Sequence, residues 1–187
     1  PSSNGQFVYT TDEISGAYVA AYDITDGSNI KEVDRVRSSE NSFVIPHNVH
    51  VRGDYLVTSY YSDGIVVHDA TYPYNLIQVG NYDTYVGQTP GFDGCWGVYP
   101  FFPSGKAVAA DITKGLFILG MHYQKACYLE GVVTDAVSGL NLSNVQVQLS
   151  SAVMQEQTNQ LGFYATGTAL SGVYTVSFSK AGYYTMS

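Results

Sequence analysis

The sequence predicts an all-β protein: a partial β-propeller of about three blades, followed by a small, incomplete β-sandwich. Short apolar runs alternate with polar residues at a period of two, which is typical of half-buried strands. One hairpin-like pattern occurs three times in the first two thirds of the chain, and no helical period competes with it. We therefore expect blades in residues 1–124 and the sandwich in residues 125–187.

Each copy of the repeat is a strand, a short turn that carries a glycine, and a second apolar strand. The copies begin at Phe7, Tyr55 and Lys106. Within these copies, Val8, Leu56 and Val108 are 48 and 52 residues apart, about the length of one propeller blade. Residues 30–33 and 76–79 are candidates for a further strand in two of the blades. A propeller ring needs roughly four to eight blades, so we expect the missing blades from the rest of the chain or from another chain.

The last third, from Cys127, is a series of short alternating runs separated by glycines, as in an antiparallel sandwich. The recognisable strands stop at Tyr183 and Tyr184. An unfinished sandwich leaves an open edge that pairs readily with another strand. We therefore expect the sandwich to be incomplete by itself, with its missing strand supplied by downstream sequence or by another chain.

Composition excludes two classes of partner. The chain has a net charge of −8, only 13% charged residues and no cluster of Lys or Arg. Nucleic acids and anionic membranes require a basic face. No apolar run is long enough for a membrane-spanning helix. The low Lys content and the 17 Tyr favour an extracellular protein.

The two cysteines, Cys95 and Cys127, are expected to form a disulfide that ties the two domains together. A bridge over this length of chain would contribute about 3–4 kcal/mol to stability in the chain-entropy account. Two separate buried thiols are the alternative.

Seven short motifs carry a resemblance to a known family. They are YTTDE (9–13), IPHNVH (45–50), TSYYSDG (58–64), GNYDT (80–84), WGVYPF (96–101), PSG (103–105) and DITKGLF (111–117). In this order they resemble the LVIVD-repeat β-propellers of bacterial surface proteins, in particular the secreted choice-of-anchor B family. The resemblance covers nearly all of residues 5–120. It implies a location at the cell surface and no established catalytic activity.

The runs of residues 127–187 are similar to a carboxypeptidase-regulatory-like, transthyretin-type β-sandwich. This module implies a stalk or spacer of a secreted protein.

Superposing the three repeats brings together a set of strand ends. The first strands of the hairpins end at Asp12 and Glu13, at Tyr60 and Tyr61, and at Asp111. His47 and His50 lie just before the second of these strands. Equivalent strand ends converge near one face of a propeller, so we expect these side chains to approach each other.

Metal binding by these residues has little support. His47 and His50 are an odd number of positions apart on an extended segment, so their rings are expected on opposite faces and not on one ion. His47 is expected instead to satisfy backbone groups between blades. Carboxylate pairs at Asp12 and Glu13 and at residues 23–26 offer oxygen ligands for calcium, but neither has EF-hand spacing. Residues 23–29 have the composition of a tight turn.

Aromatic side chains are the other candidates for binding, because exposed rings stack on sugars or anchor protein partners. Tyr60, Tyr61 and Trp96 belong to this group. For Trp96 we expect packing between blades, with a binding role as the alternative. No nucleophile elbow, phosphate loop or zinc motif occurs. We therefore expect a non-catalytic binding, adhesion or assembly protein of the cell surface, with a protein or glycan partner. The alternative is a metal-assisted hydrolase with a site near His47 and Asp111.

Overall fold

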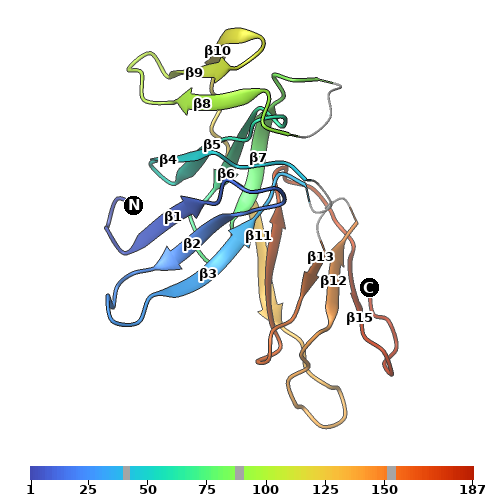
Figure 1. The fold of residues 1–187 in the computed structure, drawn as a ribbon. Coiled ribbons are helices and arrows are strands. Elements are labelled where there is room, and N and C mark those ends of the chain that lie inside the picture. The colour runs from blue at the N-terminus through green and yellow to red at the C-terminus, as the bar shows by residue number, and fades with distance from the viewer. Residues whose placement is uncertain (40–42, 87–90, 151–154) are drawn as a thin grey trace. The chain divides into compact units, whose positions relative to one another are not determined.

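The computed structural model of the chain is built from β-strands and loops alone (Figure 1). It describes residues 1–39, 43–86, 91–150 and 155–187. These residues form no helix, and hence none that is long and apolar enough to cross a membrane. They divide into two compact units, Pro1–Lys125 and Ala126–Ser187. The described residues form five antiparallel sheets, and these do not close into a ring or a barrel.

The first unit holds three sheets. Sheet I has the order β1-β2-β3, sheet II the order β4-β5-β6-β7, and sheet III the order β10-β9-β8. The strands are β1 (Phe7–Thr11), β2 (Val19–Asp23), β3 (Lys31–Val36), β4 (Asn48–Arg52), β5 (Tyr55–Ser59), β6 (Ile65–Asp69), β7 (Ile77–Tyr82), β8 (Cys95–Tyr99), β9 (Lys106–Asp111) and β10 (Gly115–Gly120). All neighbours pair in antiparallel fashion. The candidate strands near residues 30 and 76 are confirmed as β3 and β7.

The three predicted hairpins are β1-β2, β5-β6 and β9-β10, and they share one register. Val19 faces Thr11 in the first, and Ile65 faces Ser59 in the second. The next strand adds a β-bulge at the same point in both sheets, after Ala21 in sheet I and after Val67 in sheet II. A bulge bends and twists a strand locally. The repeat in the sequence is therefore a repeat in three dimensions.

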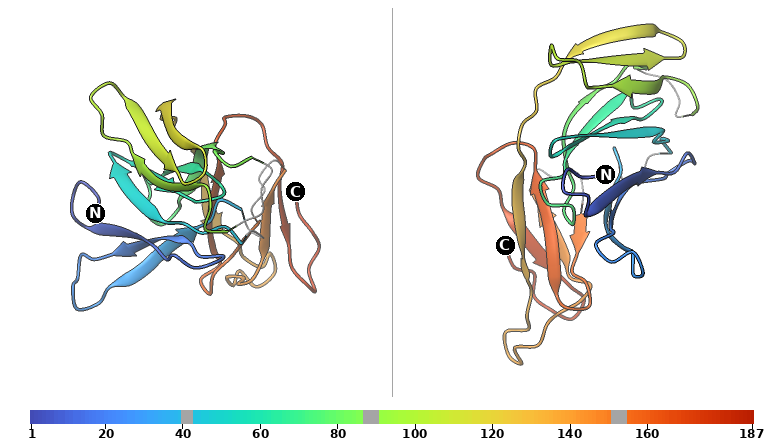
Figure 2. Two further views of the ribbon diagram at one scale, coloured as in Figure 1. Left: turned by 45° about the horizontal axis from the view of Figure 1, so that its top comes forward. Right: turned by 90° about the vertical axis from the view of Figure 1, so that its left-hand side faces the viewer.

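Sheet II lies between the other two sheets (Figures 1 and 2). Every residue of β6 is buried, as are four of the five residues of β5. A strand covered on both faces loses the polar alternation of a surface strand, and β6 reads Ile-Val-Val-His-Asp. The core of the first unit is therefore centred on sheet II.

Hydrogen bonds and ring contacts connect the three sheets. The Asp34 carboxylate of β3 accepts a bond from the buried Leu76 N–H of sheet II at 2.5 Å. Burial raises the pKa of Asp34 to about 6. Between sheets II and III, the rings of Tyr82 and Phe117 lie 6.0 Å apart. Each sheet is thus fixed to its neighbour by side chains from its outer strands.

The turn predicted at residues 23–29 is confirmed in the β2-β3 connection. Asp23 accepts bonds from the backbone and hydroxyl of Thr25, and Asp26 does the same for Ser28. These bonds lower the pKa of both carboxyls. The two carboxylates thus stabilise a turn by the side-chain bonding that Asp favours in such positions.

The second unit consists of two small sheets. Sheet IV pairs β11 (Cys127–Val132) with β14 (Phe163–Thr168), and sheet V has the order β13-β12-β15. The strands of sheet V are β12 (Gln146–Leu149), β13 (Gln155–Gln157) and β15 (Val176–Ser179). Met186 forms a bridge to Phe178 at the edge of β15. Within the described residues, β11 and β14 each have one strand partner.

The predicted disulfide between Cys95 and Cys127 is absent, and both thiols are free. Cys95 is fully buried in β8, where its sulfur contacts the Gly97 carbonyl at 3.5 Å, whereas Cys127 is exposed at the start of β11. The two sulfurs of a disulfide lie about 2 Å apart and share one environment. These two cysteines occupy opposite environments, so the prediction of a bridge was wrong.

Candidate binding cluster at the strand ends

Four of the predicted residues meet where the three sheets of the first unit come together. Glu13 follows β1 of sheet I, His47 precedes β4, Tyr61 follows β5, and Trp96 lies in β8 of sheet III. We call these four residues the Glu13 cluster. Residues separated by more than 80 positions thus share one site because each lies at or next to a strand end.

The Glu13 carboxylate is the polar centre of the cluster. The Tyr61 hydroxyl donates a hydrogen bond to Glu13 Oε1. His47 Nε2 lies 3.6 Å from the same oxygen. Both contacts use Oε1, and the Glu13 side chain is about half exposed. Burial, with the bond to Glu13 and its charge, raises the pKa of Tyr61 to about 12. Tyr61 therefore remains a protonated donor at neutral pH.

The orientation of the His47 ring is set by the backbone of sheet III. His47 Nδ1 contacts the carbonyl oxygen of Trp96. The side-chain nitrogen of Asn48 also lies 2.8 Å from Nδ1, so the ring is held between the backbone of sheet III and its own neighbour in the chain. The other ring nitrogen, Nε2, faces the Glu13 carboxylate. His47 thus satisfies a backbone group between sheets, as the sequence led us to expect.

Aromatic rings surround this polar centre. The His47 ring lies 5.1 Å from Trp96 and 5.4 Å from Tyr61, between ring centroids. Phe92 packs edge-on against Tyr61 at 5.4 Å. Trp96 is 53% exposed and Phe92 is exposed as well. The packing of Trp96 as core between blades was therefore a wrong prediction.

A β-bulge explains the exposure of Trp96. The register between β8 and β9 shifts between Cys95 and Gly97, and Trp96 is the extra residue. Cys95 and Val98 on either side are buried. Bulges commonly redirect a side chain next to a functional site. Here the bulge sends the indole outward, while the Trp96 carbonyl accepts bonds from His47 and from Ser59 Oγ at 3.2 Å.

The backbone at Tyr61 is held in an unusual conformation. Its φ is +41°, in the left-handed region that residues with side chains rarely adopt. Two backbone bonds with Cys95, of 2.7 and 2.9 Å, hold it there. Gly94 allows this approach, because a Cβ at Gly94 would lie 2.4 Å from the Tyr61 carbonyl oxygen. Strained backbone at a surface cluster is a reason to look for function.

The other predicted residues do not join the cluster through any contact of the described residues. Tyr60 is fully buried, which raises its pKa. His50 packs its ring against Phe101, and burial lowers its pKa. Asp12 is exposed, and its carbonyl accepts a bond from Ile14. The Asp111 carboxylate accepts hydrogen bonds from the N–H groups of Thr113 and Lys114 in the following turn. Burial by itself raises the pKa of Asp111, but the hydrogen bonds to the carboxylate outweigh it and lower the pKa below its ordinary value.

Metal chemistry and nucleophilic catalysis find little support in this arrangement. Among the described residues, no group of three or more His, Cys, Asp or Glu is placed to hold a metal ion. The Ser59 hydroxyl next to the cluster donates to the carbonyls of Trp96 and Asn48. A serine nucleophile needs a hydrogen bond to a base, and His47 directs its nitrogens to Glu13 and Trp96 instead.

Sequence reasoning missed Phe92 and the bulge at Trp96. Phe92 lies in a glycine-flanked turn, and an apolar residue between Gly91 and Gly94 was the only signal available.

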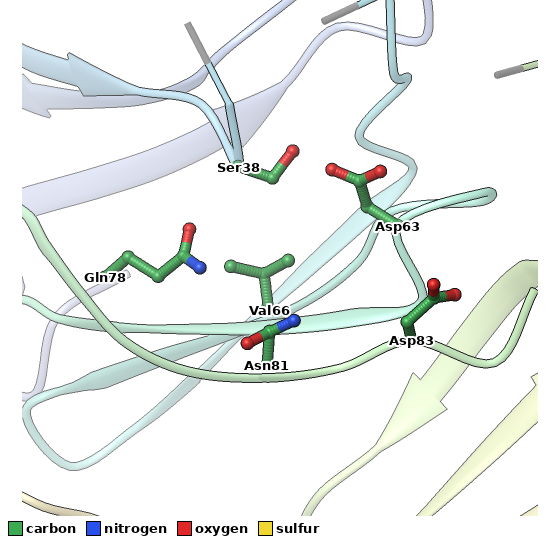
Figure 3. Close-up of a pocket in the computed structure, with 6 residues that line it drawn as sticks. All are labelled: Ser38, Asp63, Val66, Gln78, Asn81 and Asp83. Carbon is green, nitrogen blue, oxygen red and sulfur yellow. The ribbon is translucent and has the colours of Figure 1, made fainter. Parts of the chain in front are cut away.

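A separate polar pocket of about 200 Å³ lies beside sheets I and II (Figure 3). It is lined by Ser38, Asp63, Val66, Gln78, Asn81 and Asp83. Burial, and then the charge of Asp83, raise the pKa of Asp63 above its ordinary value. The two carboxylates lie there without an aromatic surface among the lining residues, and this lining defines no ligand.

Comparison with protein families, with curated proteins and with solved structures finds no match to this chain. The resemblance to LVIVD-repeat propellers therefore stays a prediction.

Proposed function

We propose that the chain is a non-catalytic carbohydrate-binding protein that recognises a glycan at the Glu13 cluster. One observation carries the proposal: a half-exposed indole, a half-exposed carboxylate and a fixed phenol come from three sheets, and the His47 ring contacts all three, while the phenol also bonds to the carboxylate. Binding sites combine apolar surface with a few placed polar groups, and this cluster has both.

The chemistry of the cluster fits a sugar ring. One face of a pyranose is apolar and stacks on an aromatic side chain, and the half-exposed Trp96 and the exposed Phe92 provide such a surface. The hydroxyls of a sugar are hydrogen-bond donors, and Glu13 presents a carboxylate oxygen to accept them. The net charge of −8 favours a neutral ligand over an anionic one.

The fold supports a place for this site in a β-propeller. Sheets I to III follow one another in chain order, their hairpins share one register, and two of them share a bulge position. These are properties of consecutive blades. We propose that the first unit is part of an LVIVD-repeat propeller of the choice-of-anchor B type, and that the second unit is a carboxypeptidase-regulatory-like spacer. A secreted protein of a bacterial cell surface is the setting that fits both.

The test is a glycan-binding screen of the purified protein, followed by calorimetric titration of the best ligand. Trp96→Ala and Glu13→Gln should each weaken binding by about tenfold or more, as expected for central contacts of a site. Tyr72→Ala removes another exposed ring, which packs against Tyr74 and not against the cluster rings, and should leave the affinity unchanged. The proposal is wrong if no glycan binds, or if binding persists undiminished in both cluster variants.

A further inference from the structure

One face of sheet III, the face that does not contact sheet II, is apolar and exposed. The equivalent faces of sheets I and II are buried. In β10, the side chains of Leu116 and Ile118 are 66% and 65% exposed. Val108 pairs with Ile118 in the neighbouring strand β9 and lies on the same face. Contiguous apolar surface on a soluble protein marks an interaction site.

The contacts between sheets define two kinds of face. We call the face directed to the next sheet in chain order the forward face, and the opposite one the rear face. Asp34, on the forward face of sheet I, bonds to Leu76 of sheet II. Tyr82, on the forward face of sheet II, contacts Phe117 on the rear face of sheet III. Forward faces therefore pack on rear faces.

The shared register identifies equivalent residues on the forward faces. Leu116 corresponds to Ile65 of sheet II, which is 1% exposed, and Ile118 corresponds to Val67, which is 8% exposed. In sheet I the equivalents are Val19 and Ala21, both fully buried. Two of the three forward faces are thus buried under the rear face of another sheet, and the third has the same apolar character without a cover.

The rear face of sheet I is open at Thr10, although Ala20 beside it is buried and Arg35 of β3 pairs with Ala20 on this face. Thr10 on this face is exposed, whereas its equivalents Thr58 and Ala109 in sheets II and III are fully buried. All three residues are small, which lets an apolar face approach closely. Ala20, which pairs with Thr10, is small as well. One chain therefore presents both halves of the interface that it uses internally.

We propose that two copies of this chain associate head to tail, so that the forward face of sheet III in each copy packs on the rear face of sheet I in the other. The new contact repeats the I–II and II–III contacts. Two copies of three sheets give six, within the roughly four to eight sheets that close a ring. Closure limits the assembly to a dimer, because a head-to-tail contact that did not close would build filaments.

Analytical ultracentrifugation of the full chain over a wide concentration range tests the proposal. The wild-type protein should sediment as a dimer. Ile118→Asp on the forward face, and Thr10→Arg on the rear face of sheet I, should each weaken the dimer by at least about 100-fold, because each places a charge in the contact. Both positions are exposed in the single chain, so folding should be unaffected. Val137→Asp, at a fully exposed position of the second unit, is the matched control.

A mixture of the two variants distinguishes this arrangement from others. The Ile118→Asp variant keeps an unchanged rear face on sheet I, and the Thr10→Arg variant keeps an unchanged forward face on sheet III. A dimer of one copy of each therefore has one intact contact. The mixture should dimerise better than either variant alone. A wild-type monomer would overturn the proposal. So would open-ended oligomers, or a dimer that is sensitive to Ile118→Asp but not to Thr10→Arg, since that result indicates two forward faces packed on each other.

Discussion

Cys95 and Cys127 differ in each property that controls thiol reactivity. Burial and the nearby charge of Asp111 raise the pKa of Cys95 to about 12, and its side chain has no exposed surface. Cys127 is exposed. Thiolates react and thiols do not, and access to reagent is also required. Cys127 is therefore the reactive cysteine of the native chain.

We expect a thiol reagent to label one cysteine in the native protein and two after unfolding in denaturant. Mass spectrometry of the labelled peptides should identify Cys127 as the native site. In a Cys127→Ser variant, the native protein should not react at all. Rapid labelling of Cys95 under native conditions would contradict the buried position of β8.

His68 is a buried titratable side chain at the centre of sheet II. It is fully buried, and neither ring nitrogen has a hydrogen-bond partner among the described residues. Burial lowers its pKa to about 3. In the unfolded chain the pKa of a histidine is about 6.5, so between these values the unfolded state binds a proton that the folded state does not. Stability is therefore complete above about pH 6.5 and declines as the pH falls towards 3.

Replacing His68 with Leu should remove this pH dependence. At pH 4 the wild-type protein should have lost about 3 kcal/mol of unfolding free energy through this residue alone. Urea titrations at pH 7 and pH 4 measure the loss, and the His68→Leu variant should show a smaller one. His122→Leu, at an exposed position, serves as control. Equal losses in wild type and His68→Leu would contradict the assignment.

At the scale of the element, the turn after β5 is joined to the start of β8 by a contact that depends on glycine. Gly94 has a φ of +96°, and an added Cβ would overlap the Tyr61 carbonyl. Gly105 has a φ of +74° but an open surrounding, with no atom within 4 Å of such a Cβ. Comparing an alanine substitution at each of these two glycines therefore separates the effect of backbone strain from the effect of steric overlap.

Gly94→Ala should destabilise the first unit by about 2–4 kcal/mol, from strain and overlap together. Gly105→Ala introduces backbone strain without overlap and should lower the free energy of unfolding by about 1 kcal/mol. Chemical denaturation gives both values, and the near-ultraviolet circular dichroism of Trp96 should change in the first variant alone. Similar effects at both positions would show that the close approach of Gly94 to Tyr61 is not needed.

The sequence predicted the hairpins of the first unit because the segments of β1, β5 and β9 each end in polar residues and lead into a short turn that carries a glycine. It did not predict β4 and β8 as strands. The β8 segment contains Gly97 next to a bulge. These two segments become strands because their backbone N–H and C=O groups pair with β5 and β9. An alternation of polar and apolar residues within a segment does not show which strands pair in the folded chain.

The cluster was predicted in part for a similar reason. Superposed strand ends placed Glu13 and Tyr61 together correctly. Tyr60 was predicted with Tyr61, but the two residues follow the end of β5, where Tyr61 has a left-handed backbone, and Tyr60 is buried in the core. Asp111 ends an equivalent strand, yet its carboxylate bonds to its own turn. Which of several strand-end residues reaches the site depends on local turns, and sequence spacing does not contain that information.

At the scale of the whole molecule, the second unit has little sheet of its own. Sheet IV has two strands and sheet V has three within the described residues. Two-stranded sheets are marginal in water without further packing. An open edge of so small a sheet would accept a strand from elsewhere.

We expect residues 126–187, expressed alone, to associate or to unfold without cooperativity. Size-exclusion chromatography with light scattering, together with a urea titration, tests this. The full chain under the same conditions is the control for solvent effects. A monomeric segment with a sharp unfolding transition would show that the sandwich is complete as it stands.

Trp96 is an intrinsic fluorescent probe of the cluster. The chain contains one Trp, and its indole lies in the cluster, partly open to water and beside His47 and Tyr61. Fluorescence excited selectively in tryptophan therefore originates at a single known place. Stacking of a sugar on that ring would shift the emission to the blue and protect it from a soluble quencher. Occupancy of the cluster can thus be followed without attaching a dye.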